Sequence, residues 1–88
     1  MDSIRLDCTQ MTDREMAHDY LAQALSFPEW YGRNLDALYD LLTGYTAPLC
    51  LELLHPEALA ALGDYGCALL DTLRDAASDN PQFTLRLL

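Results

Sequence analysis

The chain has 88 residues, 51% of them hydrophobic, which is enough for one small globular domain over residues 1–88 with a single core. Fourteen Asp and Glu residues stand against five Arg and no Lys, so the formal net charge is −9. This charge argues against nucleic acid as a partner, and the missing Lys excludes Schiff-base catalysis and a phosphate-binding Walker lysine.

The sequence predicts a cytoplasmic protein that does not bind membranes. No apolar run approaches the roughly 20 residues that span a bilayer, and the N-terminus lacks the pattern of a signal peptide. Cys8, Cys50 and Cys67 are an odd number, far apart, and none forms a CxxC pair. We therefore expect all three to be buried, reduced thiols that pack as small hydrophobic groups.

Residues 3–26 predict a strand followed by a helix. Apolar and polar residues alternate over residues 3–8, as in a half-buried strand. Thr12 and Glu15 have the spacing of a capping box, so the expected helix has Thr12 as its N-cap and begins at Asp13. It must end before Pro28, which restricts the preceding residue. His18 on this helix is expected to be a solvated surface side chain.

Residues 34–43 predict a second helix with two different faces. Asn34 is a good N-cap, and Gly44 is a suitable C-terminal stop. Four leucines fall on one side at helical spacing and should face the core; they are Leu35, Leu38, Leu41 and Leu42. The opposite side carries Asp36, Tyr39, Asp40 and Thr43. In the preceding loop we expect Trp30 to point outward and Tyr31 to be partly buried.

The second half of the chain predicts a strand, two helices and a last strand. Residues 48–54 form an apolar run typical of a central strand, in which Glu52 should point to the less covered face. Pro56 suits the first position of a short helix, which Gly63 closes. Asp64 can cap a helix of about residues 65–78, with Asp71, Asp75 and Asp79 outside. Residues 82–88 alternate as a final strand.

The resulting order is strand, helix, helix, strand, helix, helix, strand. Strands separated by helices pair in parallel, so the sequence predicts an α/β fold with a three-stranded parallel sheet and four helices covering one face. The common catalytic motifs are missing, and neither a Gly-rich phosphate loop nor a HExxH or GxSxG pattern occurs. We expect no catalytic residues, no bound metal and no cofactor.

Residues 30–44, with the pattern Trp-Tyr-Gly-x-Asn-Leu-Asp-Ala-Leu-Tyr-Asp-x-Leu-Thr-Gly, resemble the barstar family of intracellular ribonuclease inhibitors. The likeness is strong from Phe27 to about Leu53 and thinner elsewhere. It implies a fold of a three-stranded parallel sheet with four helices. It also implies that the loop and second helix block the active site of a basic, extracellular-type ribonuclease such as barnase.

The resemblance also implies roles for single residues. Asp40 would occupy the phosphate pocket of the ribonuclease, Asp36 would make a second acidic contact, and Trp30 would pack on the rim of the catalytic cleft. Other positions at or beside the implied contacts are Gly32, Asn34, Leu35, Tyr39, Thr43, Gly44, Tyr45 and Thr46. On the last helix, Asp75 matches a peripheral acidic contact and Asp79 another acidic position. The chain departs from the family pattern at Arg33, Tyr39 and Asp75, which bears on the identity of the target.

Two other functions fit the residues alone. An acidic interaction module could bind a basic protein other than a nuclease, or a second copy of itself. Asp36 and Asp40 could instead hold Mg²⁺ in a small hydrolase, although nothing in the sequence suggests the burial that tunes a catalytic carboxylate. We expect a non-enzymatic, antitoxin-like inhibitor that is a monomer when free.

Overall fold

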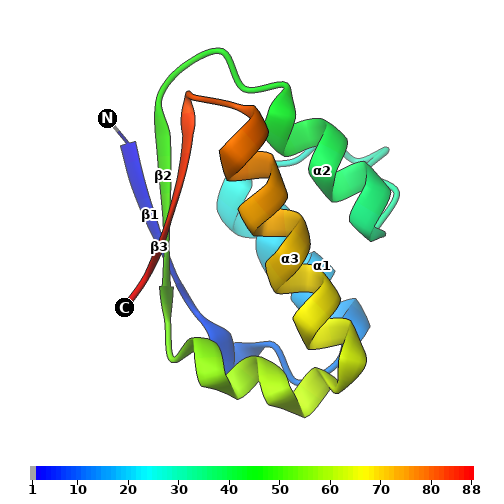
Figure 1. Ribbon diagram of the computed structural model, residues 1–88. Coiled ribbons are helices and arrows are strands. Elements are labelled where there is room, and N and C mark those ends of the chain that lie inside the picture. The colour runs from blue at the N-terminus through cyan, green and yellow to red at the C-terminus, as the bar shows by residue number, and fades with distance from the viewer. Residues whose placement is uncertain (1) are drawn as a thin grey trace.

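The computed structural model describes residues 2–88 and contains one parallel sheet with helices on one side of it (Figure 1). The strands are β1 (Asp2–Asp7), β2 (Leu49–Leu54) and β3 (Phe83–Leu87), in the spatial order β1-β2-β3. Both neighbouring pairs are parallel, with Arg5 opposite Glu52 and Glu52 opposite Arg86. The predicted fold class is confirmed.

The helices are α1 (Arg14–Leu25), α2 (Leu35–Thr43), the 3₁₀-helix η2 (Pro56–Leu62) and α3 (Asp64–Asp79), after a single 3₁₀ turn η1 (Cys8–Gln10). Their order along the chain is the predicted one. Two helix starts differ from the prediction. Asp13, not Thr12, caps α1, and its side chain accepts a hydrogen bond from the Met16 backbone N–H at 2.8 Å. Asp64 is the first residue of α3 and Gly63 precedes it as the cap residue.

The core lies between the sheet and the helices. β2 is the central strand, and five of its six residues are buried, as its apolar run predicted. Leu6, Leu51 and Phe83 come from the three strands, and Leu21, Leu38 and Leu69 from the three α-helices; all six are buried in one cluster. The apolar stripe of each helix therefore fastens it to the same sheet face.

The cysteine prediction is right for two residues and wrong for the third. Cys8 and Cys50 are buried free thiols, and burial raises the pKa of Cys8 to about 11, which keeps it protonated and unreactive. Cys67 is exposed, because it lies on the outer side of α3 next to the buried Gly66. A cysteine within an apolar pattern does not by itself identify the buried side of a helix.

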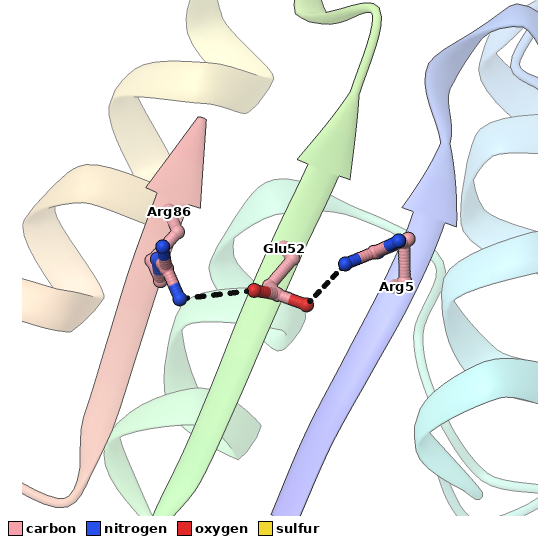
Figure 2. A network of polar contacts seen from close by, with 3 residues as sticks. All are labelled: Arg5, Glu52 and Arg86. Atoms are coloured by element: carbon pink, nitrogen blue, oxygen red, sulfur yellow. Dashed lines mark hydrogen bonds and ion pairs between the residues drawn. The ribbon is translucent and has the colours of Figure 1, made fainter. Parts of the chain in front are cut away.

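The face of the sheet away from the helices carries a cluster of one carboxylate and two guanidinium groups (Figure 2). Glu52 on β2 accepts hydrogen bonds from Arg5 at 3.4 Å and from Arg86 at 3.2 Å, one on each neighbouring strand. The two guanidinium groups cover the carboxylate so that Glu52 is only 8% exposed. Glu52 thus lies on the less covered face, as predicted, and its two cations come from the parallel register.

Candidate functional site

Helix α2 has the two faces that its sequence predicted. Asn34 caps it, with Oδ1 accepting from the Ala37 N–H at 2.7 Å, and Gly44 ends it. Leu38 and Leu42 are fully buried, while Leu35 and Leu41 are half-buried at the edges of the stripe. The leucines fasten α2 to the core, so the backbone positions from which the residues of its other face project are fixed.

The outer face of α2 meets α3 at Tyr39. The Tyr39 hydroxyl donates to the carboxylate of Asp79, which belongs to the last turn of α3. This hydrogen bond raises the pKa of Tyr39, and the negative charges of Asp79, Asp75 and Asp40 act in the same direction. Acidic side chains from two helices therefore surround Tyr39. Asp75 and Asp79 on α3 lie 35 or more positions after Asp40 on α2 in the sequence.

We define the acidic surface as Trp30, Asp36, Tyr39, Asp40 and Asp75. All its members except Tyr39 are exposed. In residues 2–88 no ion pair involves Asp36, Asp40 or Asp75, whereas Glu52 has two. Exposed carboxylates on a rigid helix can accept charge-assisted hydrogen bonds from a guanidinium, and sometimes two at once.

The loop before α2 shows one aromatic ring and buries the next. Trp30 is 76% exposed, as expected, and Tyr31 is only 5% exposed, which is deeper than the predicted partial burial. Tyr31 packs against Phe27 with ring centroids 4.8 Å apart. A large indole that is this exposed is unusual for a protein surface and suits a contact with a partner.

Gly32 lies where the loop closely approaches α2, so a side chain there would be tightly packed. A Cβ atom at this position would lie 3.1 Å from Asn34 Nδ2 and 3.3 Å from Ala37 Cβ. The Asn34 side chain also donates to the Gly32 carbonyl at 3.2 Å. Gly32 and Asn34 therefore shape the loop and the helix start, and they place Trp30 and Asp36 relative to each other.

Arg33 adds a cation at the edge of this surface. Its φ of 53° lies in the left-handed region, which disfavours residues other than glycine, asparagine and aspartate. Its guanidinium pairs with Asp19 on α1, and both side chains are about half-exposed. The loop therefore carries one positive charge that a partner of α2 would meet.

Asn80 holds the C-terminal end of α2 in place, although the sequence indicated only that Asn80 marks the end of the last helix. Asn80, which follows α3, is buried, and its Nδ2 donates to the carbonyls of Leu42 at 2.9 Å and Tyr45 at 3.1 Å. These bonds satisfy backbone acceptors at the C-terminus of α2, which otherwise lack partners. The only local signal was Asn before Pro81, which indicates a turn and not this long-range contact.

Asp40 also borders an open hollow of about 250 Å³. The hollow is lined by Ser26, Phe27, Pro28, Asp40, Leu41, Gly44 and Tyr45. Tyr45 is half-buried there, its hydroxyl donates to the Leu25 carbonyl at 3.3 Å, and burial raises its pKa. A partner side chain that enters this hollow would meet mostly apolar groups with one carboxylate at the edge.

The prediction for His18 is wrong. This side chain is 1% exposed and lies between two tyrosine hydroxyls, with Nδ1 2.6 Å from Tyr31 Oη and Nε2 2.5 Å from Tyr65 Oη. Burial lowers the pKa of His18, and the nearby Arg14 and Arg33 lower it further. Helical spacing from Leu21 and Leu25 could have placed His18 on the inner side, but its polar character suggested the surface.

The described residues contain neither a metal-binding cluster nor a membrane-spanning helix. No group of three or more His, Cys, Asp or Glu residues in this part of the chain could hold a metal ion. Within the same residues, the helices are too short or too polar to cross a membrane. The outer faces of α2 and α3 present exposed carboxylates, and the loop before α2 presents the exposed Trp30 ring.

Comparison with known proteins agrees with the resemblance. The family model described as "Barstar (barnase inhibitor)" matches residues 1–87. The chain belongs to the barstar family. A relative in Bacillus subtilis (strain 168), named "Putative ribonuclease inhibitor YrdF", is 40% identical over 81 residues, which cover 90% of this chain and 89% of the relative.

In this barstar-family chain, the predicted contact residues come from the loop before α2, from α2 itself, from the two residues after it and from α3. Trp30, Gly32 and Asn34 belong to the loop; Leu35, Asp36, Tyr39, Asp40 and Thr43 belong to α2, and Gly44 and Tyr45 follow it. Asp75 comes from α3 and joins them through its position near Tyr39. Leu35 and Thr43 are half-buried, and the Thr43 hydroxyl donates back to the Tyr39 carbonyl at 2.8 Å.

Proposed function

We propose that this barstar-family protein inhibits a basic, barnase-like ribonuclease by covering its active site with the acidic surface. The observation that supports this best is Asp40, an exposed carboxylate on a helix fixed by Leu38 and Leu42, with an apolar hollow beside it. A ribonuclease cleft must hold an anionic RNA backbone, so it presents cations. Asp40 would take the place of a phosphate and accept hydrogen bonds from them.

The surrounding residues support the same mode of binding. Trp30 would cover the rim of the cleft and exclude water, which strengthens the hydrogen bonds to Asp40. Asp36 and Asp75 would add acidic contacts on either side. The net charge of −9 would accelerate the encounter with a basic protein at low salt. The inhibitor would act as a cytoplasmic monomer, without catalysis and without a cofactor.

Replacement of Asp40 by alanine tests the proposal directly. Removing one partner of a buried, hydrogen-bonded ion pair costs about 2 to 5 kcal/mol, a general range that includes measurements on the barnase–barstar complex itself. We expect D40A to bind barnase, or the cognate ribonuclease, at least about 30-fold more weakly. Calorimetry would measure affinity, and an RNA-cleavage assay would measure inhibition.

The matched control is D71A. Asp71 is an exposed aspartate on α3 outside the acidic surface, so its loss changes the net charge equally. D71A should bind within about threefold of wild type, because distant surface charges contribute little to affinity. Equal binding by D40A and wild type would overturn the mechanism. If wild type binds no ribonuclease but captures another basic protein in an Asp40-dependent way, the interaction-module alternative would replace it.

A further inference from the structure

The network around His18 joins the loop before α2 to two other elements. His18 belongs to α1, Tyr31 to the loop, and Tyr65 to the first turn of α3. The imidazole also packs against both phenol rings, with centroid distances of 5.7 Å and 5.9 Å. In the described part of the chain, the Tyr31 hydroxyl makes no other side-chain hydrogen bond, so His18 supplies the polar contact that fixes this buried ring, in addition to the ring's packing against Phe27.

The chemistry of a neutral imidazole determines which way the protons point. One ring nitrogen donates and the other accepts. Tyr31 is buried and needs an acceptor for its hydroxyl proton, whereas Tyr65 is partly exposed and can donate to water. The consistent arrangement has Tyr31 donating to Nδ1 and Nε2–H donating to Tyr65. Every buried polar side-chain atom of residues 2–88 then has a partner.

Protonation of His18 would break this arrangement. Both ring nitrogens would donate, so the Tyr31 hydroxyl proton would lose its acceptor inside the protein. The charged groups near the ring do not favour the imidazolium. Arg14 lies on the same helix and stacks 4.1 Å above the Tyr65 ring, Arg33 comes from the loop, and Asp19 is already paired with Arg33.

From this geometry we infer that His18 is a positioning residue for the binding loop, which it holds through Tyr31, and that acidification releases the loop and weakens partner binding. This inference rests on the proposed function for its binding consequence. The conformational change does not depend on that function, because the fluorescence of Trp30, which lies in the loop, reports it without any partner. Trp30 is the only tryptophan of the chain and the immediate neighbour of Tyr31.

The direction of the pH effect follows from the lowered pKa of His18. The unfolded chain titrates near the ordinary value of 6.5 and the folded protein below it. The stabilisation from the neutral network is therefore complete above about pH 6.5 and is lost as the pH falls toward the folded-state value. We therefore expect the loop to be held, and the partner to be bound tightly, above about pH 6.5.

The first experiment uses the free protein and measures Trp30 fluorescence and its quenching by acrylamide from about pH 8 to pH 5, while far-UV circular dichroism follows folding. We expect a change in Trp30 emission below pH 6.5 with the helices intact. In H18N, which keeps a polar atom at the position of Nδ1 and cannot become charged, this change should disappear. A transition that persists in H18N, or no transition in the wild type, would overturn the inference.

Two tyrosine variants provide a matched pair if H18N does not fold. Tyr31→Phe removes the hydroxyl that connects His18 to the loop, and Tyr65→Phe removes the one that connects it to α3. We expect the pH-dependent change in Trp30 emission to be lost in Y31F and kept in Y65F. A purely structural role for His18 would affect both variants alike, and that result would contradict the inference.

The binding consequence is measured with a ribonuclease that the wild type inhibits at pH 7.5. Affinity should fall about tenfold more between pH 7.5 and 5.5 for the wild type than for H18N. The ribonuclease's own titrating groups affect both proteins equally, so the difference between the profiles belongs to His18. Parallel profiles would refute the effect on binding. Absence of ribonuclease binding at pH 7.5 would instead count against the proposed function and leave the fluorescence result standing.

Discussion

The acidic surface and the open face of the sheet both carry charged side chains, but only the carboxylate on the sheet is paired with cations. On the sheet, Glu52 lies between Arg5 and Arg86, so the carboxylate is covered and neutralised. On α2 and α3, Asp36, Asp40 and Asp75 have no cationic partner within residues 2–88. The chain has only five Arg residues, and two of them are used at Glu52.

The difference indicates which charges serve the fold and which are available to a partner. A carboxylate in the middle of a central strand must be paired, because leaving it buried alone would be costly. An aspartate on the outer face of a helix is solvated, so it needs no partner within the chain. Asp36, Asp40 and Asp75 are therefore carboxylates that remain available to a partner on the side of α2 away from its leucine stripe.

The largest predicted loss of stability comes from shortening a leucine that anchors α2 to the core. Leu38→Ala deletes a fully buried side chain, and such substitutions cost about 2 to 5 kcal/mol of unfolding free energy. Urea denaturation would measure this loss. On the same helix, Asp36→Ala should change stability by only about 0.5 kcal/mol, because Asp36 is exposed. Similar stabilities for the two variants would mean that the leucine stripe does not hold α2.

A smaller effect is expected at the open sheet face. Glu52→Ala leaves Arg5 and Arg86 facing each other without a shared carboxylate, and both are more than half exposed, so solvent limits the penalty to about 1 to 2 kcal/mol. Chemical denaturation measures this cost. Affinity for the ribonuclease should stay within about twofold, since the sheet face lies opposite the helices. A large loss of binding by E52A would show that the two faces are not independent.

The smallest effect concerns salt. Raising sodium chloride from about 50 mM to 500 mM should slow association with a basic ribonuclease by about five- to tenfold and leave dissociation nearly unchanged. Stopped-flow fluorescence of Trp30 would separate the two rates. D40A should retain most of this salt dependence, because steering depends on the summed charge, whereas its dissociation should be much faster. An association rate independent of salt would argue against electrostatic steering.

Much of the fold could be predicted because local signals agreed with the tertiary structure. Alternation identified β1 and β3, the apolar run identified β2, and Asn34, Gly44 and Pro56 marked helix ends that the structure contains. The leucine spacing correctly separated the buried side of α2 from its acidic side. The family pattern of residues 30–44 added the expected contact roles, which geometry alone could not have assigned.

The errors occur where neighbouring residues compete or where the deciding contact is distant in sequence. Thr12 and Asp13 are both good N-caps, and local spacing could not choose between them. His18 is buried because two tyrosines, 13 and 47 positions away, satisfy its ring nitrogens. Asn80 reaches Leu42 across 38 positions. Polar residues that are buried by long-range hydrogen bonds have the same local pattern as solvated ones.

At Arg33, the backbone conformation favours a different residue from the one that the ion pair with Asp19 needs. The left-handed backbone at Arg33 would be relieved by glycine or asparagine, which adopt this conformation at lower cost. Either replacement would also remove the cation beside Trp30 and the ion pair with Asp19. A chain selected only for stability would therefore move away from arginine here. The position lies in the loop, outside the leucine stripe that anchors α2, so such a replacement would leave that anchor intact.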